Sequence, residues 1–184
     1  VFRELGAAVA EVSIPLLELT APIFVSIADT DGASTYQDLL KTRAQELDEN
    51  TRTRLLAASF VPASLYNKAQ RARRLLRQQV LDALGRVDIL VSPTTPQPPQ
   101  KIAEMAPRFS SKEDVVKRMF GVRSYMPAYA LAGLPAISIP CGFTEGNLPI
   151  GLQIAGRPFE EGTVFRAASA YEAATPWHLR RPPV

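Results

Sequence analysis

Apolar residues recur every three or four positions from Pro62 to Leu84, and this spacing predicts a long amphipathic helix. The apolar stripe consists of Leu65, Ala69, Ala72, Leu76, Val80 and Ala83. The opposite stripe is polar and includes Arg71 and Arg74, with Arg73 and Arg77 alongside it. No aromatic side chains interleave with these arginines, so the pattern favours a solvated helix face over a phosphate-binding edge.

Three further helical regions are predicted along the chain. Apolar residues keep a loose helical spacing from Leu16 to about Leu47, where Asp29, Asp31 and Gly32 predict a turn between two helices. A second pattern runs from about Lys112 to Ala132. The last helix begins near Glu160 and Glu161, which we interpret as helix-start residues, and it ends at Thr175 and Pro176. Its buried stripe consists of Val164, Ala168 and Tyr171.

Short apolar runs between these regions predict β-strands. Ala7 to Val12 suits a brief strand, and the uninterrupted run from Asp88 to Ser92, ended by Pro93, fits a strand covered on both faces. Ala136 to Pro140 predicts a buried strand, and the alternation of Ile150, Leu152 and Ile154 with smaller or polar residues predicts another. The short connection between the last two favours a hairpin.

Strands and helices in mixed order indicate the α/β class, and no linker or repeat divides residues 1–184, so we expect a single domain. The region from Gln97 to Ser111 lacks periodicity and predicts a loop. With 184 residues and 46% hydrophobic composition, the chain can bury a real core.

Charge and residue counts exclude several classes of protein. A net charge of +3 gives no reason to expect a nucleic-acid partner. One cysteine and one histidine exclude an internal disulfide and a closed zinc site. No apolar run is long enough for a membrane span and no signal peptide is readable, so a cytoplasmic location is expected. The ten glycines are never adjacent and never separated by one residue, which excludes dinucleotide, phosphate-loop and serine-elbow motifs.

Few residues remain as candidates for chemistry. Thr94 and Thr95 follow a predicted strand, where ligands often bind in α/β sheets, although hydroxyls bonded to nearby backbone in a rigid loop would explain them equally well. Cys141, between Pro140 and Gly142, favours a small buried cysteine over a nucleophile paired with His178. His178 itself lies close to the chain end and is expected at the surface. No complete active site can be assembled from these residues.

Several segments together resemble one family. The segments are ALAGLPAISIPCG from Ala130 to Gly142, LPIGLQIAGRPF from Leu148 to Phe159, YEAATPWH from Tyr171 to His178 and VDILVSPTTP from Val87 to Pro96. In this order they resemble the C-terminal part of amidase signature enzymes. The resemblance spans essentially the whole chain and implies the corresponding portion of the amidase signature fold, with a mixed β-sheet covered by helices.

The resemblance implies a serine amidohydrolase, in which a lysine activates the nucleophilic serine through a second serine. Those family residues precede the matched region, so no catalytic role passes to any residue here, including Ser138 and Lys117. The chain is therefore expected to be a C-terminal fragment that is inactive alone. Its partners would be the rest of the amidase polypeptide and a small amide substrate, with no metal or cofactor.

By the same resemblance, this part of the family supplies one wall of the substrate pocket. Thr94, Thr95, Tyr125 and Met126 occupy the corresponding positions and are the predicted substrate-binding residues. Ala130 stands where the family usually has asparagine, and Arg123 and Met126 replace other residue types. The alternative is a non-enzymatic assembly module that forms a homo-oligomer or pairs with a partner through an exposed sheet face.

Overall fold

The long helix predicted from Pro62 to Leu84 is confirmed. The computed structural model describes residues 1–99 and 125–181, and helix α5 spans Ala63–Leu84. Its buried residues are Ala69, Leu76, Val80, Ala83 and Leu84. Leu65, which the spacing assigns to this face, is 45% exposed, so the buried stripe begins one turn later, at Ala69.

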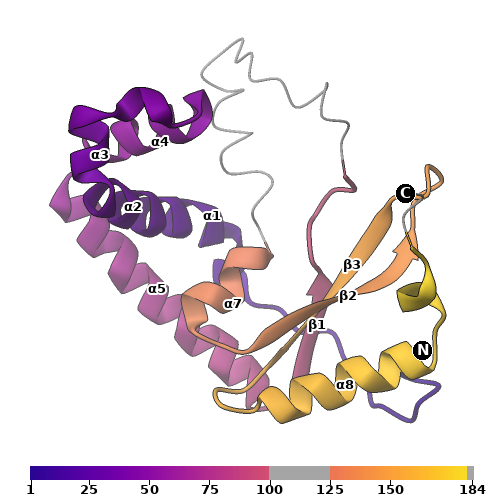
Figure 1. The fold of residues 1–184 in the computed structure, drawn as a ribbon. Coiled ribbons are helices and arrows are strands. Elements are labelled where there is room, and N and C mark those ends of the chain that lie inside the picture. Colours follow the sequence, from indigo (N-terminus) through magenta and orange to yellow (C-terminus); the bar gives the residue numbers. More distant parts are fainter. Residues whose placement is uncertain (100–124, 182–184) are drawn as a thin grey trace.

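Shorter helices precede α5 and carry the chain away from the strands (Figure 1). They are α1 Thr20–Phe24, α2 Thr30–Thr35, α3 Gln37–Thr42 and α4 Glu49–Ala58. Turns of 3₁₀-helix, Pro15–Leu19 and Ala44–Glu46, precede α1 and follow α3. A π-helical turn, Val25–Asp29, joins α1 to α2 without a break.

The predicted turn at Asp29, Asp31 and Gly32 is wrong, because the helix continues through these residues to Thr35. Asp29 is 6% exposed, and its Oδ1 lies 3.5 Å from Nε of Arg54 on α4. A Cβ added at Gly32 would lie 3.0 Å from Cδ2 of Leu55 on α4. The polar and small residues therefore serve the contact between this helix and α4, although they are also typical of a turn.

Three antiparallel strands form a sheet in the order β1-β3-β2. Their bounds are Ile89–Pro93 for β1, Ala136–Phe143 for β2 and Pro149–Gly156 for β3. The hairpin is confirmed, with Ser138 of β2 opposite Gln153 of β3. The α/β class is likewise confirmed, and the pairings among the described strands are all antiparallel.

Strand β1 lies at the edge of this sheet, since β3 is its only partner in the described part of the chain. The prediction of a strand covered on both faces is wrong, because Val91 is 44% exposed whereas its neighbour Leu90 is 7% exposed. Helix α8, Glu161–Ala173, packs chiefly on β2 and β3, and the core beneath it includes Ile89 of β1 but leaves Val91 exposed.

The segment Ala7 to Val12 is not a strand. A strand needs a neighbour for its main-chain hydrogen bonds, and none of the three described strands pairs with this segment. Its surroundings nevertheless hold it at both ends. The ring of Phe2 lies 5.4 Å from that of Tyr171 in α8, and Ile14 is buried against the helices.

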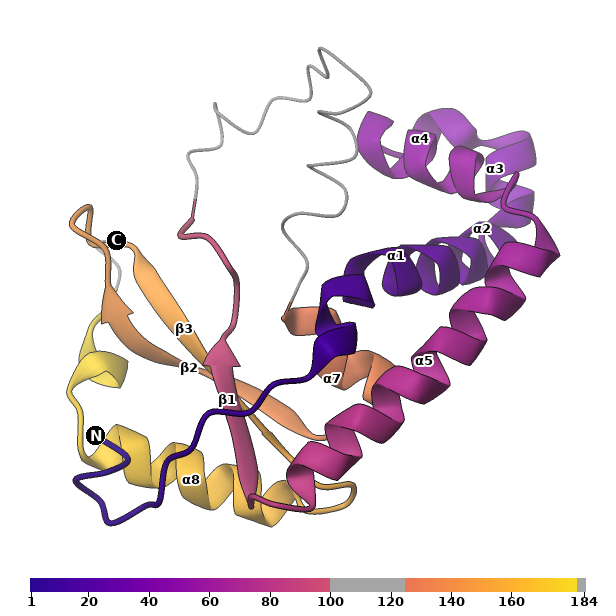
Figure 2. The ribbon, with the colours of Figure 1, turned by 180° about the vertical axis from the view of Figure 1, so that it is seen from behind.

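Each face of the sheet carries its own apolar core. Figure 2 shows α8 and α5 on different sides of the strands. On one face, Ile139 of β2 and Ile154 of β3 pack on α8, whose buried residues Val164, Ala168 and Tyr171 match the predicted stripe. The other core contains Leu90 and Ala155 together with side chains of α1, α5 and the short helix α7, Met126–Ala132. This alternation follows from the two-residue period of strands.

Helix α7, Met126–Ala132, is the described part of the helix predicted from Lys112 to Ala132; residues 112–124 and most of the predicted loop 97–111 lie outside the described residues. Arg73 Nε donates to the Leu131 carbonyl at 2.7 Å, and Arg77 donates to the Ala132 carbonyl. Gly133 then ends the helix at φ 65°, a conformation that favours glycine.

The prediction of a solvated arginine face is therefore wrong for Arg73 and Arg77. The last carbonyls of a helix have no hydrogen-bond donor within the helix, and these two arginines donate to the last carbonyls of α7. Arg71 and Arg74 are exposed, as predicted.

Arg157 joins three elements at the base of the sheet. It donates to the carbonyl of Leu84 at 3.0 Å and to that of Val87 at 2.9 Å, and it lies 3.4 Å from carboxylate oxygens of Asp88 and Glu160. One side chain thus connects the end of α5, the start of β1 and the start of α8.

We expect Arg157→Ala to lower the free energy of unfolding by about 1–3 kcal/mol, because two half-buried carbonyls lose a charged donor. Arg166→Ala is the matched control, since Arg166 is exposed and bonds only to Thr163 in the described structure. Urea unfolding followed by circular dichroism measures both variants. Equal losses in the two variants would contradict the role given to Arg157.

Candidate functional site

A pair of hydroxyl groups bridges the two outer strands of the sheet above Gly151. Thr94 follows the end of β1, and its Oγ1 lies 2.6 Å from Oγ of Ser138 on β2. The N–H of Thr94 donates to the carbonyl of Gly151 on the intervening strand β3 at 2.9 Å. The two side chains meet because the position between them has no side chain.

Glycine is required at position 151 by these contacts. A Cβ there would lie 2.6 Å from Oγ1 of Thr94 and 2.9 Å from Oγ of Ser138, distances well inside van der Waals contact. Next along the sheet, Gln153 lies between Ser92 and Ser138 and is 8% exposed. Oε1 of Gln153 is buried and has no hydrogen-bond partner among the described residues. Polar side chains therefore continue along this face from Thr94.

Thr95 has a local role in the structure. Its hydroxyl donates to the carbonyl of Gln97 at 2.9 Å, which is the turn geometry that threonine often adopts. The two threonines thus differ, because Thr94 bonds across the sheet and Thr95 bonds within its own loop.

Tyr125 immediately precedes α7, and Met126 begins it. Met126 is 52% exposed and lines a cavity of about 530 Å³. The other lining residues are Phe24, Ala28, Asp29, Arg54, Pro127 and Ala130. Thr94, Thr95 and Tyr125 are not among them, so the structure does not bring the four predicted residues into one pocket.

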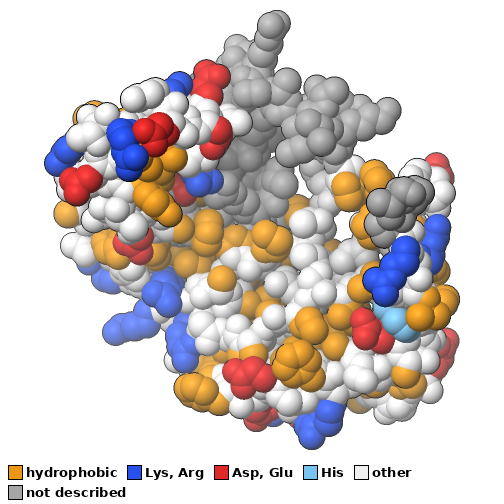
Figure 3. All heavy atoms as spheres, in the orientation of Figure 1, with side chains coloured by type: hydrophobic (Ala, Val, Ile, Leu, Met, Phe, Trp, Pro, Cys, Tyr) orange, Lys and Arg blue, Asp and Glu red, His pale blue; other side chains and the backbone are white. Residues whose placement is uncertain are grey.

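Most of the cavity wall is apolar, and the Asp29–Arg54 ion pair supplies its charge. On the face shown in Figure 3, apolar side chains gather between the helices and the strands. Sequence reasoning missed Asp29 and Arg54. The sequence did contain a signal for the ion pair, because Asp29 lies within an apolar helical pattern. An aspartate that is buried in such a helix is rarely without a charged partner.

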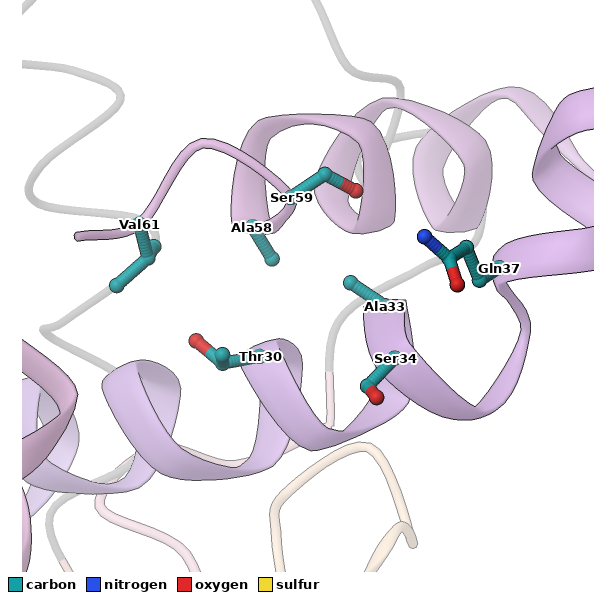
Figure 4. Close-up of a pocket in the computed structure, with 7 residues that line it drawn as sticks. All are labelled: Thr30, Ala33, Ser34, Gln37, Ala58, Ser59 and Val61. Carbon is teal, nitrogen blue, oxygen red and sulfur yellow. The ribbon is translucent and has the colours of Figure 1, made fainter. Parts of the chain in front are cut away.

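A second hollow, of about 210 Å³, lies between α2 and the end of α4 (Figure 4). Two of the three hydroxyl residues that line it bond to the carbonyl four residues earlier, since Thr30 donates to the Ser26 carbonyl and Ser59 to the Leu55 carbonyl. No titratable side chain lines it among the described residues, so it offers no catalytic group.

The environment of Cys141 agrees with a packed cysteine. It is partly buried against the core under α8, and this burial raises the pKa of its thiol. Burial also raises the pKa of Tyr171, with a smaller contribution from the Cys141 charge. His178 is half-buried in the turn Trp177–Leu179, where its Nδ1 has no hydrogen-bond partner among the described residues. The expectation of a surface histidine holds only in part.

Residues 1–99 and 125–181 contain no group of three histidine, cysteine, aspartate or glutamate side chains arranged to hold a metal ion. Among the same residues, no helix combines the length and apolar character needed to cross a membrane.

The Amidase family model matches residues 1–165, so the chain belongs to the amidase signature family. The chain is similar to the A subunit of glutamyl-tRNA(Gln) amidotransferase, with 33% identity to that of Cupriavidus taiwanensis and 36% identity to that of a Synechococcus strain. These matches include 98% and 99% of this chain. It covers 40% and 38% of those proteins, and so spans about two fifths of their length.

Solved structures give the same result. The chain is similar to the glutamyl-tRNA(Gln) amidotransferase A subunit of Thermotoga maritima, with 32% identity and a TM-score of 0.70, over 95% of this chain and 36% of that one. A crystal structure of an amidase matches with 26% identity and a TM-score of 0.77, over 94% and 39% of the two chains. The expected family fold is therefore confirmed.

We expect Gly151→Ala to separate Thr94 from Ser138 and to lower the free energy of unfolding by about 1–3 kcal/mol, the range typical of overpacking. Gly142→Ala is the matched control, because a Cβ at Gly142 meets nothing within 4 Å. Chemical denaturation measures both variants. A neutral Gly151→Ala variant would contradict the close packing described above.

We expect Cys141, the only cysteine, to be alkylated by iodoacetamide more slowly in the folded chain than in the urea-unfolded chain at about pH 8. Because burial raises the pKa of the folded thiol, less of it is the reactive thiolate, and the difference should shrink as the pH rises past that pKa. Mass spectrometry measures the rate against pH. A midpoint below that of the unfolded chain would instead indicate an activated nucleophile.

Proposed function

We propose that this chain is part of an enzyme that hydrolyses a carboxamide or a related C–N bond, and that it forms one wall of the substrate pocket. Membership of the amidase signature family supports the reaction class. The match to only about two fifths of the relatives supports the view that other polypeptide supplies the nucleophile and its base.

The chemistry of the described residues supports the view that the nucleophile and its base lie in other polypeptide. The hydroxyls of Thr94 and Ser138 are close together, but a nucleophilic hydroxyl needs a base within hydrogen-bond reach. The lysines of the described part, Lys41 and Lys68, are exposed and lie on α3 and α5, not on the strands that carry these hydroxyls. The serine–serine–lysine group is therefore proposed to lie outside this chain.

The observation that carries the pocket assignment is the cavity beside Met126. Its volume of about 530 Å³ falls within the range of small-molecule sites, roughly 300–1,000 Å³. Met126 and Tyr125 are proposed to contact the substrate from the start of α7. Thr94 and Thr95 are proposed to border the same pocket at the end of β1 once the remaining polypeptide is in place. The mostly apolar wall suits an amide with an apolar body.

A second candidate function is the non-enzymatic assembly module. The exposed edge strand β1 and the exposed aromatic side chains of Phe159 and Phe165, 94% and 63% exposed, favour some covering partner. We place this function second, because about three fifths of each relative lies outside the match and could cover these surfaces in cis.

The test compares the isolated chain with a full-length chimera, in which this chain replaces the matching region of the Thermotoga maritima protein. On a panel of aryl and aliphatic amides, we expect the isolated chain to be inactive and the chimera to hydrolyse at least one amide at an enzyme-like rate, about 1 s⁻¹ or more. In that chimera, Met126→Trp should fill the cavity and raise KM about tenfold, which is about 1.4 kcal/mol, with little change in kcat.

Leu75→Trp is the control for the added indole, because Leu75 is exposed on α5 and lines neither cavity. Amide hydrolysis by the isolated chain would contradict the proposal that the catalytic residues lie outside it. Equal KM values for the two tryptophan variants would contradict the pocket assignment.

A further inference from the structure

The cavity beside Met126 is lined by one charged hydrogen-bond donor among the described residues, the guanidinium of Arg54 on α4. The side chain of Arg54 is 40% exposed, whereas that of Asp29, its partner in the ion pair, is 7% exposed. The carboxylate is thus enclosed by protein. The guanidinium is the charged group of this wall that water and a ligand can reach.

Asp29 lies against one edge of this guanidinium. The ion-pair distance of 3.5 Å joins Oδ1 of Asp29 to Nε of Arg54, and that nitrogen is buried. Arginine has further N–H donors on Nη1 and Nη2, arranged in a planar fork. No described residue accepts a hydrogen bond from these two nitrogens of Arg54. The ion pair therefore holds the side chain in place and leaves its outer donors available.

A second carboxylate on the same helix does not occupy these donors. Asp48 caps α4, and its side chain accepts a hydrogen bond from the N–H of Thr51 at 3.1 Å. The hydrogen bonds from Thr51 are the main reason why the pKa of Asp48 is lowered, and the charge of Arg54 makes only a minor contribution. Asp48 does not line the cavity.

The rest of the described lining offers no acceptor of comparable strength, since its side chains are apolar: Phe24, Ala28, Met126, Pro127 and Ala130. A ligand that fills this space displaces water from Arg54. A charged donor that loses water without gaining an acceptor raises the free energy of the complex. A wholly apolar ligand would leave the donor in that state, whereas a ligand with an anionic group would satisfy it.

A carboxylate fits this donor better than a phosphate does. The fork of a guanidinium matches the two oxygens of a carboxylate, which it can bind with two parallel hydrogen bonds. A phosphate group carries more negative charge at neutral pH and has three acceptor oxygens. One guanidinium edge in an otherwise apolar wall supplies too few donors for it.

We propose that the cavity beside Met126 binds a small molecule with an apolar body and a carboxylate, and that the carboxylate pairs with the outer edge of Arg54. This inference rests on the proposed function for the identity of that molecule as the substrate. The substrate class is then an amide that also carries a carboxylate, and Arg54 is a residue that determines specificity.

Binding of three probes with the same apolar body tests the inference without any need for catalysis. Hexanoate, hexanamide and hexylamine are titrated into the isolated chain and into the chimera, and NMR follows the side-chain Nε–H signal of Arg54. We expect hexanoate to bind at least about tenfold more tightly than hexanamide, which is about 1.4 kcal/mol, and to shift the Arg54 signal.

Arg54→Lys keeps the positive charge beside Asp29 but removes the fork, so it should weaken hexanoate binding at least about threefold and leave hexanamide unchanged. Arg52→Lys is the matched control, because Arg52 is half-buried on the same helix and lines neither cavity. The double variant Asp29→Asn with Arg54→Met removes both charges, so that no buried carboxylate is left without Arg54. It should bind hexanoate no better than hexanamide.

Hydrolysis by the chimera tests the step from ligand to substrate. The substrates are monoamides of dicarboxylic acids, from glutaric to suberic acid, each compared with the simple amide of the same chain length. We expect at least one monoamide to have a kcat/KM at least about tenfold higher than its simple amide, mainly through a lower KM. Arg54→Lys should reduce this ratio, and Arg52→Lys should not.

Equal affinity for the three probes, no binding of any of them, or a hexanoate preference that survives in the double variant would overturn the inference. Tighter binding of hexylamine would overturn it as well, and would assign the recognition to Asp29. Hexanoate binding that depends on Arg54, in a chimera that hydrolyses no amide, would leave the carboxylate site standing and remove the proposed function. Amide hydrolysis without any carboxylate preference would do the reverse.

Discussion

The arrangement of strands and helices depends on arginine side chains that bind main-chain carbonyls where regular structure ends. Helix termini leave carbonyls without partners, and a guanidinium can satisfy more than one of them because its donors are fixed in a plane. Arg157 uses this geometry on the carbonyls of Leu84 and Val87, while Arg73 and Arg77 bond those at the end of α7. Helix α5 is thereby fixed to β1 at one end and to α7 along its side.

This constraint explains how Thr94 and Met126 are held although they lie on different elements. Thr94 follows β1, whose entry is held by Arg157, and Met126 begins α7, whose exit is held by Arg73 and Arg77. The close contact of Thr94 with Ser138 then needs only the missing side chain of Gly151. The positions of both candidate residues are thus set by contacts made some distance from them, at the ends of α5 and α7.

The elements whose apolar face packs against other described residues could be predicted from the sequence. The buried residues of α5 and α8 and the β2–β3 hairpin follow from periods of 3.6 and 2, because each apolar face finds its cover among the described residues. The predictions for Asp29 and for Arg73 and Arg77 were wrong because their roles depend on partners distant in sequence. The cavity beside Met126 was missed for the same reason, since its walls come from α1, the π-helical turn, α4 and α7.

The two failed strand predictions have a different cause. Ala7–Val12 has the pattern of a strand but no neighbour among the described strands, and β1 has the pattern of a doubly covered strand, although Val91 is 44% exposed and the strand lies at the edge of the described sheet. The pattern of a strand reflects how its side chains pack, and it does not specify which neighbours cover its faces and edges. The same limit applies to the hydroxyl pair of Thr94 and Ser138, because the pattern of each strand does not show that the two side chains meet above Gly151.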